Sequence, residues 1–233
     1  MKTIGLIGGL SWESSVEYYR LINEGVKQKL GGLHSAQCLM YSVDFGPIEE
    51  LMRQGNWQQV NKVLVEAALH LKQGGADFII ICSNTIHKCA DSIIEQTGMP
   101  VLHIADAAAQ KIKEQKIKKV GLLGTRFVME GDFYRQRLKE DHDIEVMIPA
   151  EKERESINAI IFQELCRGVL KEDSKEQFPK IINKLLQLGA EGIVLGCTEI
   201  PLLIKQADVA APVFDTTTLH AAMAVAYSLK GDN

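Results

Sequence analysis

The sequence predicts an α/β protein made of two similar parallel-sheet domains. Short apolar runs alternate along the whole chain with amphipathic stretches of helical length. Strands that alternate with helices in this way form parallel sheets. Several runs are continuous in Ile, Val and Leu, which is typical of strands covered on both faces. The runs lie at residues 3–9, 37–45, 76–83, 100–104, 119–125, 144–150, 191–199 and 211–216, and the helical stretches at 14–29, 58–73, 133–141, 155–168 and 175–188.

An internal repeat indicates two copies of one βα series. The segment "GADFIIICSNT" from Gly75 resembles "GAEGIVLGCTE" from Gly189, 114 residues later. "IGLIGG" and "VGLLGT" match at an offset of 116, and "MPVL" and "APVF" match at 112, in the same order. We therefore expect a first α/β domain of residues 1–99 plus 211–233 and a second of residues 100–210. Ligands bind outside the carboxyl ends of strands in such sheets, so we expect an active site in a cleft between the two domains.

Composition excludes several classes of partner. The 233 residues carry a formal net charge of -4, without the excess of Lys and Arg that nucleic acid or an anionic membrane requires. No apolar run approaches the ~20 residues of a membrane span, and the start of the chain lacks a signal-peptide pattern. Five cysteines are scattered without a disulfide framework. We expect a cytoplasmic protein with free thiols.

The repeat selects the candidate catalytic residues. The offset of 114 aligns Ser83 with Cys197, whereas Cys82, on the opposite face of its strand, is interpreted as a core residue. A hydroxyl and a thiol on opposite sides of one small ligand suit inversion at a tetrahedral carbon. Backbone N–H groups at a strand-to-helix junction favour negative charge, so we expect them to lower the pKa of the Cys197 thiol and to hold a substrate carboxylate.

Three motifs, "GLIGGLSWES", "CSNT" and "GCTE", resemble the aspartate/glutamate racemases that need no pyridoxal phosphate, and most closely the broad-specificity amino-acid racemases. The resemblance covers essentially the whole chain. It implies two α/β domains, a homodimer, no cofactor, and two cysteines that act as acid and base on the α-carbon of aspartate, glutamate or a relative. Cys197 matches the second cysteine, as the thiolate base on the L side. Ser83 stands in place of the first.

Further candidates surround these two residues. The resemblance and the strand-end position together give a substrate-binding set of Gly9, Leu10, Ser11, Asn84, Thr85, Thr125, Thr198 and Glu199. His87, four residues after Ser83, is a candidate for tuning or relaying a proton, or is bonded to backbone. Arg53 and Arg126 are candidates for binding a side-chain carboxylate, or are surface residues. No metal site is expected, because the spacing of Cys82, His87 and Cys89 matches no zinc signature.

Two other functions stay open at this point. A decarboxylase or isomerase of small dicarboxylates that uses one cysteine would also carry Cys197 and lack a thiol at position 83. A non-catalytic amino-acid-binding homologue would keep the binding residues without turnover.

Overall fold

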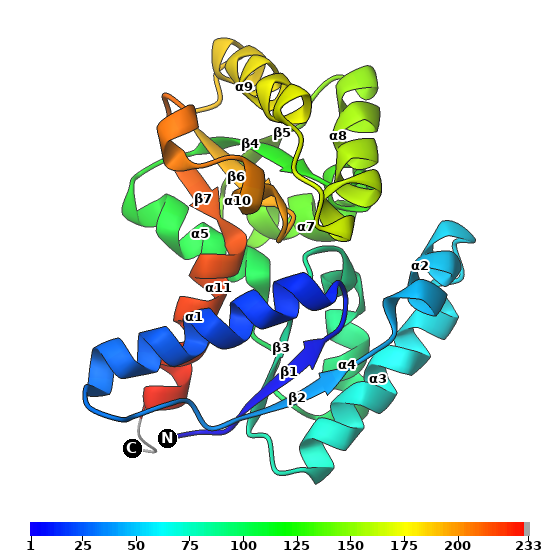
Figure 1. Cartoon of the computed structure of the whole chain (residues 1–233), viewed down its shortest axis with the longest axis vertical. Helices are drawn as coiled ribbons and strands as arrows, with labels where there is room; N and C mark the ends of the chain where they lie inside the picture. Colours follow the sequence, from blue (N-terminus) through cyan, green and yellow to red (C-terminus); the bar gives the residue numbers. More distant parts are fainter. Residues whose placement is uncertain (231–233) are drawn as a thin grey trace. The chain divides into compact units, whose positions relative to one another are not determined.

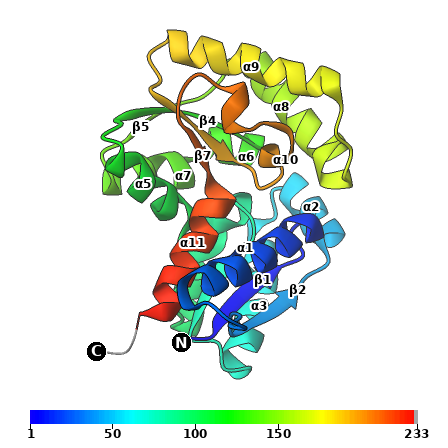
Figure 2. The same ribbon diagram turned by 60° about the vertical axis from the view of Figure 1, so that its left-hand side comes forward.

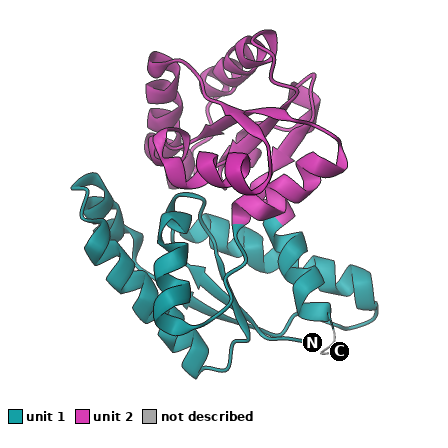
Figure 3. Cartoon of the chain, turned by 180° about the vertical axis from the view of Figure 1, so that it is seen from behind, with its two compact units in different colours: residues 1–103, 220–233 teal, residues 104–219 magenta. Residues whose placement is uncertain are grey.

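The computed structural model describes residues 1–230 and divides the chain into two compact α/β units (Figure 3). Unit 1 comprises residues 1–103 together with the chain from His220 onward, and unit 2 comprises Ile104–Leu219. The sequence placed both boundaries earlier, after residues 99 and 210. The second boundary lies later because the strand at residues 213–215 pairs inside unit 2, so the chain leaves that unit only within its last helix.

Unit 1 contains a parallel sheet in the order β2-β1-β3 (Figure 1). Tyr18 and Ile22 of α1 and Ala224 of α11 pack with Ile4, Phe78 and other strand residues on one face of this sheet. The elements are β1 Ile4–Gly8, α1 Trp12–Leu30, β2 Cys38–Ser42, α2 Phe45–Arg53, α3 Trp57–Gln73, β3 Phe78–Ile81, the 3₁₀ helix η1 Thr85–Cys89, α4 Ala90–Thr97, and most of α11 Thr216–Leu229.

Unit 2 contains a parallel sheet in the order β5-β4-β6-β7, with helices on both of its sides (Figure 2). Apolar clusters lie on both faces of this sheet. Leu123, Ile193 and Leu195 face α8 and α9, and Val120, Leu122 and Val194 face α5. The elements are α5 Ile104–Glu114, β4 Lys119–Gly124, α6 Arg126–Glu130, α7 Asp132–Gln136, a π-helical turn η2 Arg137–Asp141, β5 Glu145–Met147, α8 Glu151–Gln163, η3 Leu165–Arg167, α9 Glu172–Gln187, β6 Gly192–Gly196, α10 Ile200–Leu203, η4 Gln206–Asp208 and β7 Val213–Asp215.

The two sheets share one topology, as the internal repeat predicts. β1 lies between β2 and β3, and β4 lies between β5 and β6 in the equivalent arrangement. The neighbour on the outer side of β6 also has an equivalent in unit 1. β6 pairs with β7 through Ile193 and Val213, and β3 forms a single bridge from Ile79 to Val101. The strand expected at residues 100–104 is therefore wrong in extent, because only Val101 pairs and a helix starts at Ile104. The predicted α/β class with parallel sheets is confirmed.

Within residues 1–230, none of the helices combines the length and the apolar character that crossing a membrane requires.

Candidate active site

Ser83 lies just past the carboxyl end of β3, where the chain turns into η1. Its side chain is 9% exposed, and the next two residues, Asn84 and Thr85, are also buried. Cys82 is completely buried in the apolar cluster that joins α1, β1, β3 and α11. Burial also raises the pKa of its thiol, which disfavours the thiolate. The interpretation of Cys82 as a core residue is confirmed.

The "GGLSWESS" segment connects β1 to α1, and its serine side chains form hydrogen bonds with nearby backbone groups. Gly9 has a positive φ of 81°, and a Cβ there would lie 2.1 Å from the Val43 carbonyl oxygen, so no larger side chain fits. The Gly9 N–H donates to Ser15 Oγ at 2.8 Å, and Ser14 Oγ donates to the Cys82 carbonyl at 3.1 Å. Ser11 caps α1 by accepting from the Ser14 N–H. The start of α1 is therefore fixed against the end of β3, next to Ser83.

Cys197 follows β6 in unit 2 and belongs to a compact polar group. Its Sγ donates to Glu199 Oε2 at 2.9 Å, and Thr198 Oγ1 donates to the same oxygen at 2.8 Å. All three side chains are buried, with exposed fractions of 4–8%. One carboxylate oxygen thus accepts from both the thiol and the neighbouring hydroxyl. A buried carboxylate beside a thiol is a structural arrangement suited to moving a proton between the two.

The expected direction of the Cys197 pKa shift is wrong. The pKa of this thiol lies well above its ordinary value, first because of burial and then because of the Glu199 carboxylate, with Cys166 adding to the effect. The backbone N–H of Glu199 does lower the pKa, as the strand-end position predicts, but the other effects are larger. The resting side chain at neutral pH is therefore the thiol.

Thr125 lies at the carboxyl end of β4, beside β6. Its side chain is buried and caps α6 by accepting from the Val128 N–H at 3.3 Å. Gly124 immediately before it is required because a Cβ would lie 2.7 Å from the carbonyl oxygen of Gly196. The two glycines let β4 and β6 approach closely where they end, so Thr125 and Cys197 belong to the same edge of the sheet.

Both candidate arginines are engaged in ion pairs on the surface. Arg53 pairs with Glu50 one turn earlier in α2, and its side chain is 66% exposed. Arg126 pairs with Glu130 at 2.9 Å and with Glu155 at 3.9 Å. These contacts favour the surface interpretation of each arginine over the role of a carboxylate clamp.

Thr217 is a candidate that the sequence analysis missed. Its hydroxyl is buried, and within residues 1–230 it has no hydrogen-bond partner. It lies at the start of α11, two residues after Asp215, which is in register with Leu195 of β6. Thr216 next to it differs, because its hydroxyl donates to the Leu195 carbonyl at 2.7 Å. An unpaired buried hydroxyl beside the end of β6 was not detectable in the sequence, because "TTT" reads only as a helix start.

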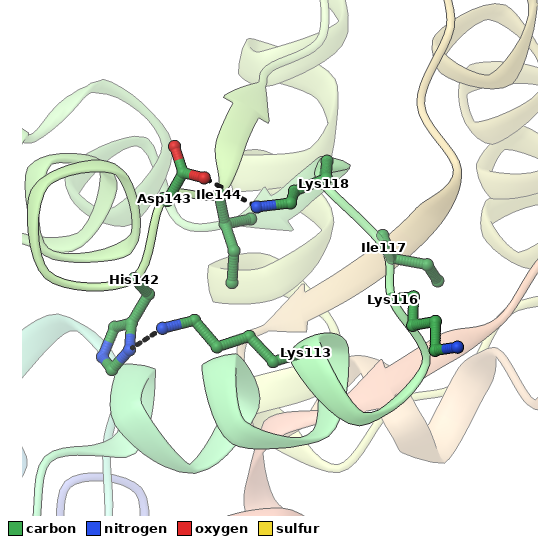
Figure 4. A pocket seen from close by; sticks show the side chains of 7 residues that line it. All are labelled: Lys113, Lys116, Ile117, Lys118, His142, Asp143 and Ile144. Atoms are coloured by element: carbon green, nitrogen blue, oxygen red, sulfur yellow. Dashed lines mark hydrogen bonds and ion pairs between the residues drawn. The ribbon is translucent and has the colours of Figure 1, made fainter.

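Unit 2 also contains a pocket of about 350 Å³ (Figure 4). None of its lining residues belongs to the strand ends that carry Thr125 and Cys197. It is lined by Lys113, Lys116, Ile117, Lys118, His142, Asp143 and Ile144, most of which directly precede β4 and β5 at their amino ends. Lys113 donates to His142 Nδ1 at 3.2 Å, and Lys118 pairs with Asp143 at 2.6 Å. Lys113 also lies in the last turn of α5, where a cation offsets the helix dipole. Lys113, His142, Lys118 and Asp143 are therefore paired with one another at the sheet edge opposite to the one where ligands bind.

Each of the two repeated α/β units carries polar side chains at its strand ends, and in unit 2 a buried thiol is bonded to a carboxylate. The Asp/Glu/Hydantoin racemase family model matches residues 7–224, so the chain belongs to this family.

Relatives with solved structures agree with this assignment. The chain is 53% identical to a putative Asp/Glu racemase from Yersinia pestis, with a TM-score of 0.92 and coverage of 99% of this chain and 100% of that one. It is 37% identical to an aspartate racemase homologue from Pyrococcus horikoshii OT3, with a TM-score of 0.85 and the same coverage. It is also 22% identical over 163 residues to the broad specificity amino-acid racemase RacX of Bacillus subtilis, which covers 68% of each chain.

Proposed function

We propose that the protein racemises aspartate, glutamate or a related amino acid without a cofactor, with Cys197 as the base on the L side. The observation that carries the proposal is the Cys197 thiol bonded to Glu199 at 2.9 Å in a member of this racemase family. Incubation with L-aspartate and with L-glutamate, followed by chiral chromatography, tests it directly. Formation of the D enantiomer is the expected result, and its absence for every amino acid tried would contradict the proposal.

Each chemical step has a named donor and acceptor. The thiol of Cys197 first loses its proton, with Glu199 Oε2 as the adjacent acceptor. The thiolate then takes the α-proton, so a C–H bond breaks, an S–H bond forms, and charge moves into the substrate carboxylate. The Ser83 hydroxyl gives a proton to the opposite face and recovers one from solvent, and Glu199 releases to solvent the proton that it took from the thiol. Because the Thr198 hydroxyl already donates to Glu199, the Thr198 backbone N–H, with Asn84 and Thr85, is proposed to supply donors for the carboxylate as its charge grows.

Other binding roles follow from the same scheme. The Leu10 N–H and the backbone at Gly9, with the hydroxyls of Ser11 and Thr125, are proposed to contact the substrate, while the Gly9 N–H itself stays donated to Ser15. Thr217 is added because its buried hydroxyl is unpaired within the described chain. We assign no cation to a side-chain carboxylate, because Arg53 and Arg126 are held by surface glutamates.

Exchange is expected to outrun inversion. A serine hydroxyl is a far weaker acid than a thiol, so return of a proton from the Cys197 side is faster than delivery from Ser83. L and D enantiomers have equal free energy, so kcat/KM is the same in both directions and the weakness of Ser83 is not visible there. In deuterated water, the L-substrate should take up α-deuterium, measured by NMR, faster than it racemises. Equal rates of uptake and inversion would show that Ser83 is not the slow donor.

The Glu199 carboxylate is expected to control ionisation of the Cys197 thiol. In Glu199→Gln the negative charge is lost and burial remains, so the thiol pKa should fall toward its ordinary value and the thiolate fraction at a fixed pH should rise. The measurement is the pH dependence of iodoacetamide alkylation at Cys197, followed by mass spectrometry. Glu191→Gln, which removes a carboxylate just before β6, is the control and should leave the midpoint unchanged. A midpoint that stays or rises in Glu199→Gln contradicts the assignment.

A decarboxylase that uses one cysteine is the second candidate function. The specific observation in its favour is that only one of the two equivalent strand ends, that of β6, carries the thiol, while the end of β3 carries Ser83. Loss of CO₂ from a substituted malonate without any inversion of amino acids would support it. Tight amino-acid binding with neither reaction would instead support a non-catalytic binding protein.

We further propose a cytoplasmic homodimer. None of the five cysteines, all of which lie within residues 1–230, forms a disulfide, which suits a reducing compartment, and the dimer rests on the family resemblance. Light scattering after size-exclusion chromatography tests the dimer, with a monomer mass of 25.8 kDa for comparison.

A further inference from the structure

Three of the six histidines form a buried cluster in unit 1, and one of them contacts the Ser83 backbone. His87, His103 and His220 are 2%, 6% and 0% exposed. The ring centroid of His87 lies 4.6 Å from that of His103 and 5.4 Å from that of His220, with edge-to-face geometry in both pairs. The three rings come from η1, from the residue before α5, and from α11. Among residues 1–230, no group of three or more His, Cys, Asp or Glu side chains is arranged to hold a metal ion.

Two of the three rings, those of His220 and His87, are held by hydrogen bonds. His220 Nε2 lies 2.8 Å from the Leu102 carbonyl, and its Nδ1 lies 2.8 Å from the Tyr18 hydroxyl. Because a carbonyl only accepts, Nε2 carries the proton, and in the neutral ring Nδ1 accepts from Tyr18. His87 Nδ1 lies 2.6 Å from the Ser83 carbonyl, so Nδ1 is the donor for the same reason.

The surroundings favour a neutral His87. Burial is the main cause that lowers its pKa, and the neighbouring His103 and His220 lower it further, against a smaller opposing effect of the Ser83 and Leu102 carbonyls. A neutral imidazole has a single N–H group. The 2.6 Å distance from Nδ1 to the Ser83 carbonyl places this N–H on Nδ1, so His87 donates to the backbone of Ser83.

We propose that His87 is a positioning residue that holds the Ser83 peptide and thereby fixes the direction of the Ser83 hydroxyl. The proposal rests on the proposed racemase function. Ser83 lies between the end of β3 and the start of η1 and belongs to neither element. The 2.6 Å bond from a ring packed between two other buried rings fixes this point. Since a misplacement of about 1 Å can cost about 100-fold in rate, loss of this bond should affect the step that uses Ser83.

A pair of polar variants separates positioning from packing. The side-chain amide of Asn reaches about as far as Nδ1 of His, whereas that of Gln reaches the position of Nε2. His87→Asn is therefore expected to keep the bond to Ser83, and His87→Gln and His87→Leu to lose it. In deuterated water, Gln and Leu should reduce L-to-D inversion on the order of tenfold more than α-deuterium uptake, because uptake needs only the Cys197 side. Asn should keep a ratio near that of the parent protein.

Tyr18→Phe is the matched control. It removes the hydroxyl that contacts His220 and so disturbs the same cluster without touching Ser83. Its ratio of inversion to uptake should equal that of the parent. If Gln and Leu slow both rates equally, or leave both unchanged, the positioning role is wrong. If Leu does not fold, the comparison of Asn with Gln still decides.

A second readout does not depend on turnover. Amide hydrogen exchange of residues 83–86 should quicken in His87→Gln and stay near the parent rate in His87→Asn. If the parent protein neither inverts nor exchanges any amino acid, the proposed function fails, and this readout alone then decides whether His87 holds the Ser83 segment. Equal protection in both variants overturns the inference.

Discussion

Cys197→Ala should lose racemisation and α-deuterium uptake together, by on the order of 100- to 10,000-fold, which is the usual contribution of a general base. In the proposed scheme the Cys197 sulfur is the only group that takes the α-proton of the L enantiomer. Without it, neither the D enantiomer nor the α-deuterated L-substrate forms. Inversion is followed by chiral chromatography and uptake by NMR in deuterated water. A variant that still exchanges the α-proton at the parent rate would show that another residue is the base.

The structure supplies the controls for this experiment. Cys197 is 6% exposed and belongs to the apolar cluster between β6 and α9, so truncation removes some packing as well as the thiol. Cys197→Ser keeps the size of the side chain and should be equally inactive. Cys38→Ala removes a half-buried thiol at the amino end of β2 in unit 1 and should keep both rates. Thermal unfolding of each variant separates loss of chemistry from loss of fold.

Ser83→Cys should raise inversion on the order of tenfold or more and leave α-deuterium uptake by the L enantiomer almost unchanged. A thiol has an ordinary pKa of about 8.5 and gives up its proton far more readily than a serine hydroxyl. The substitution also restores the thiol pair that the family resemblance implies. The ratio of uptake to inversion for the L-substrate should therefore fall toward one.

This substitution is small enough to interpret. Ser83 is 9% exposed, and Cys differs from Ser by one atom, so the backbone bond from His87 should persist. Ser35→Cys, in an exposed loop of unit 1, controls for the introduction of a new thiol and should leave both rates unchanged. If Ser83→Cys lowers inversion, the Ser83 hydroxyl has a role that a thiol does not fill, and the scheme with a weak proton donor is wrong.

Patterns that are local in the sequence predicted much of the fold. The amphipathic stretch at 58–73 became α3 to within one residue, and the repeat predicted two sheets of equivalent strand order. Elsewhere packing overrode local pattern. "PVLHI" has the composition of a strand, but only Val101 pairs, because the chain turns into α5 at Ile104. The position of the second unit boundary could also not be predicted from the sequence, because it depends on the pairing of β7 with β6.

The sequence by itself determined which strand ends carry Ser83 and Cys197, because hydrophobic runs and a constant offset are properties of the linear chain. Only the tertiary structure decided the pKa of Cys197 and the hydrogen-bond partners of the Ser83 backbone. The Cys197 pKa is raised because burial and the Glu199 carboxylate outweigh the helix-end N–H group that the sequence suggested. The partners of Ser83 are likewise a product of folding. His87, His103 and His220 have no common motif, and they meet only because η1, the segment before α5 and α11 pack together around one buried point.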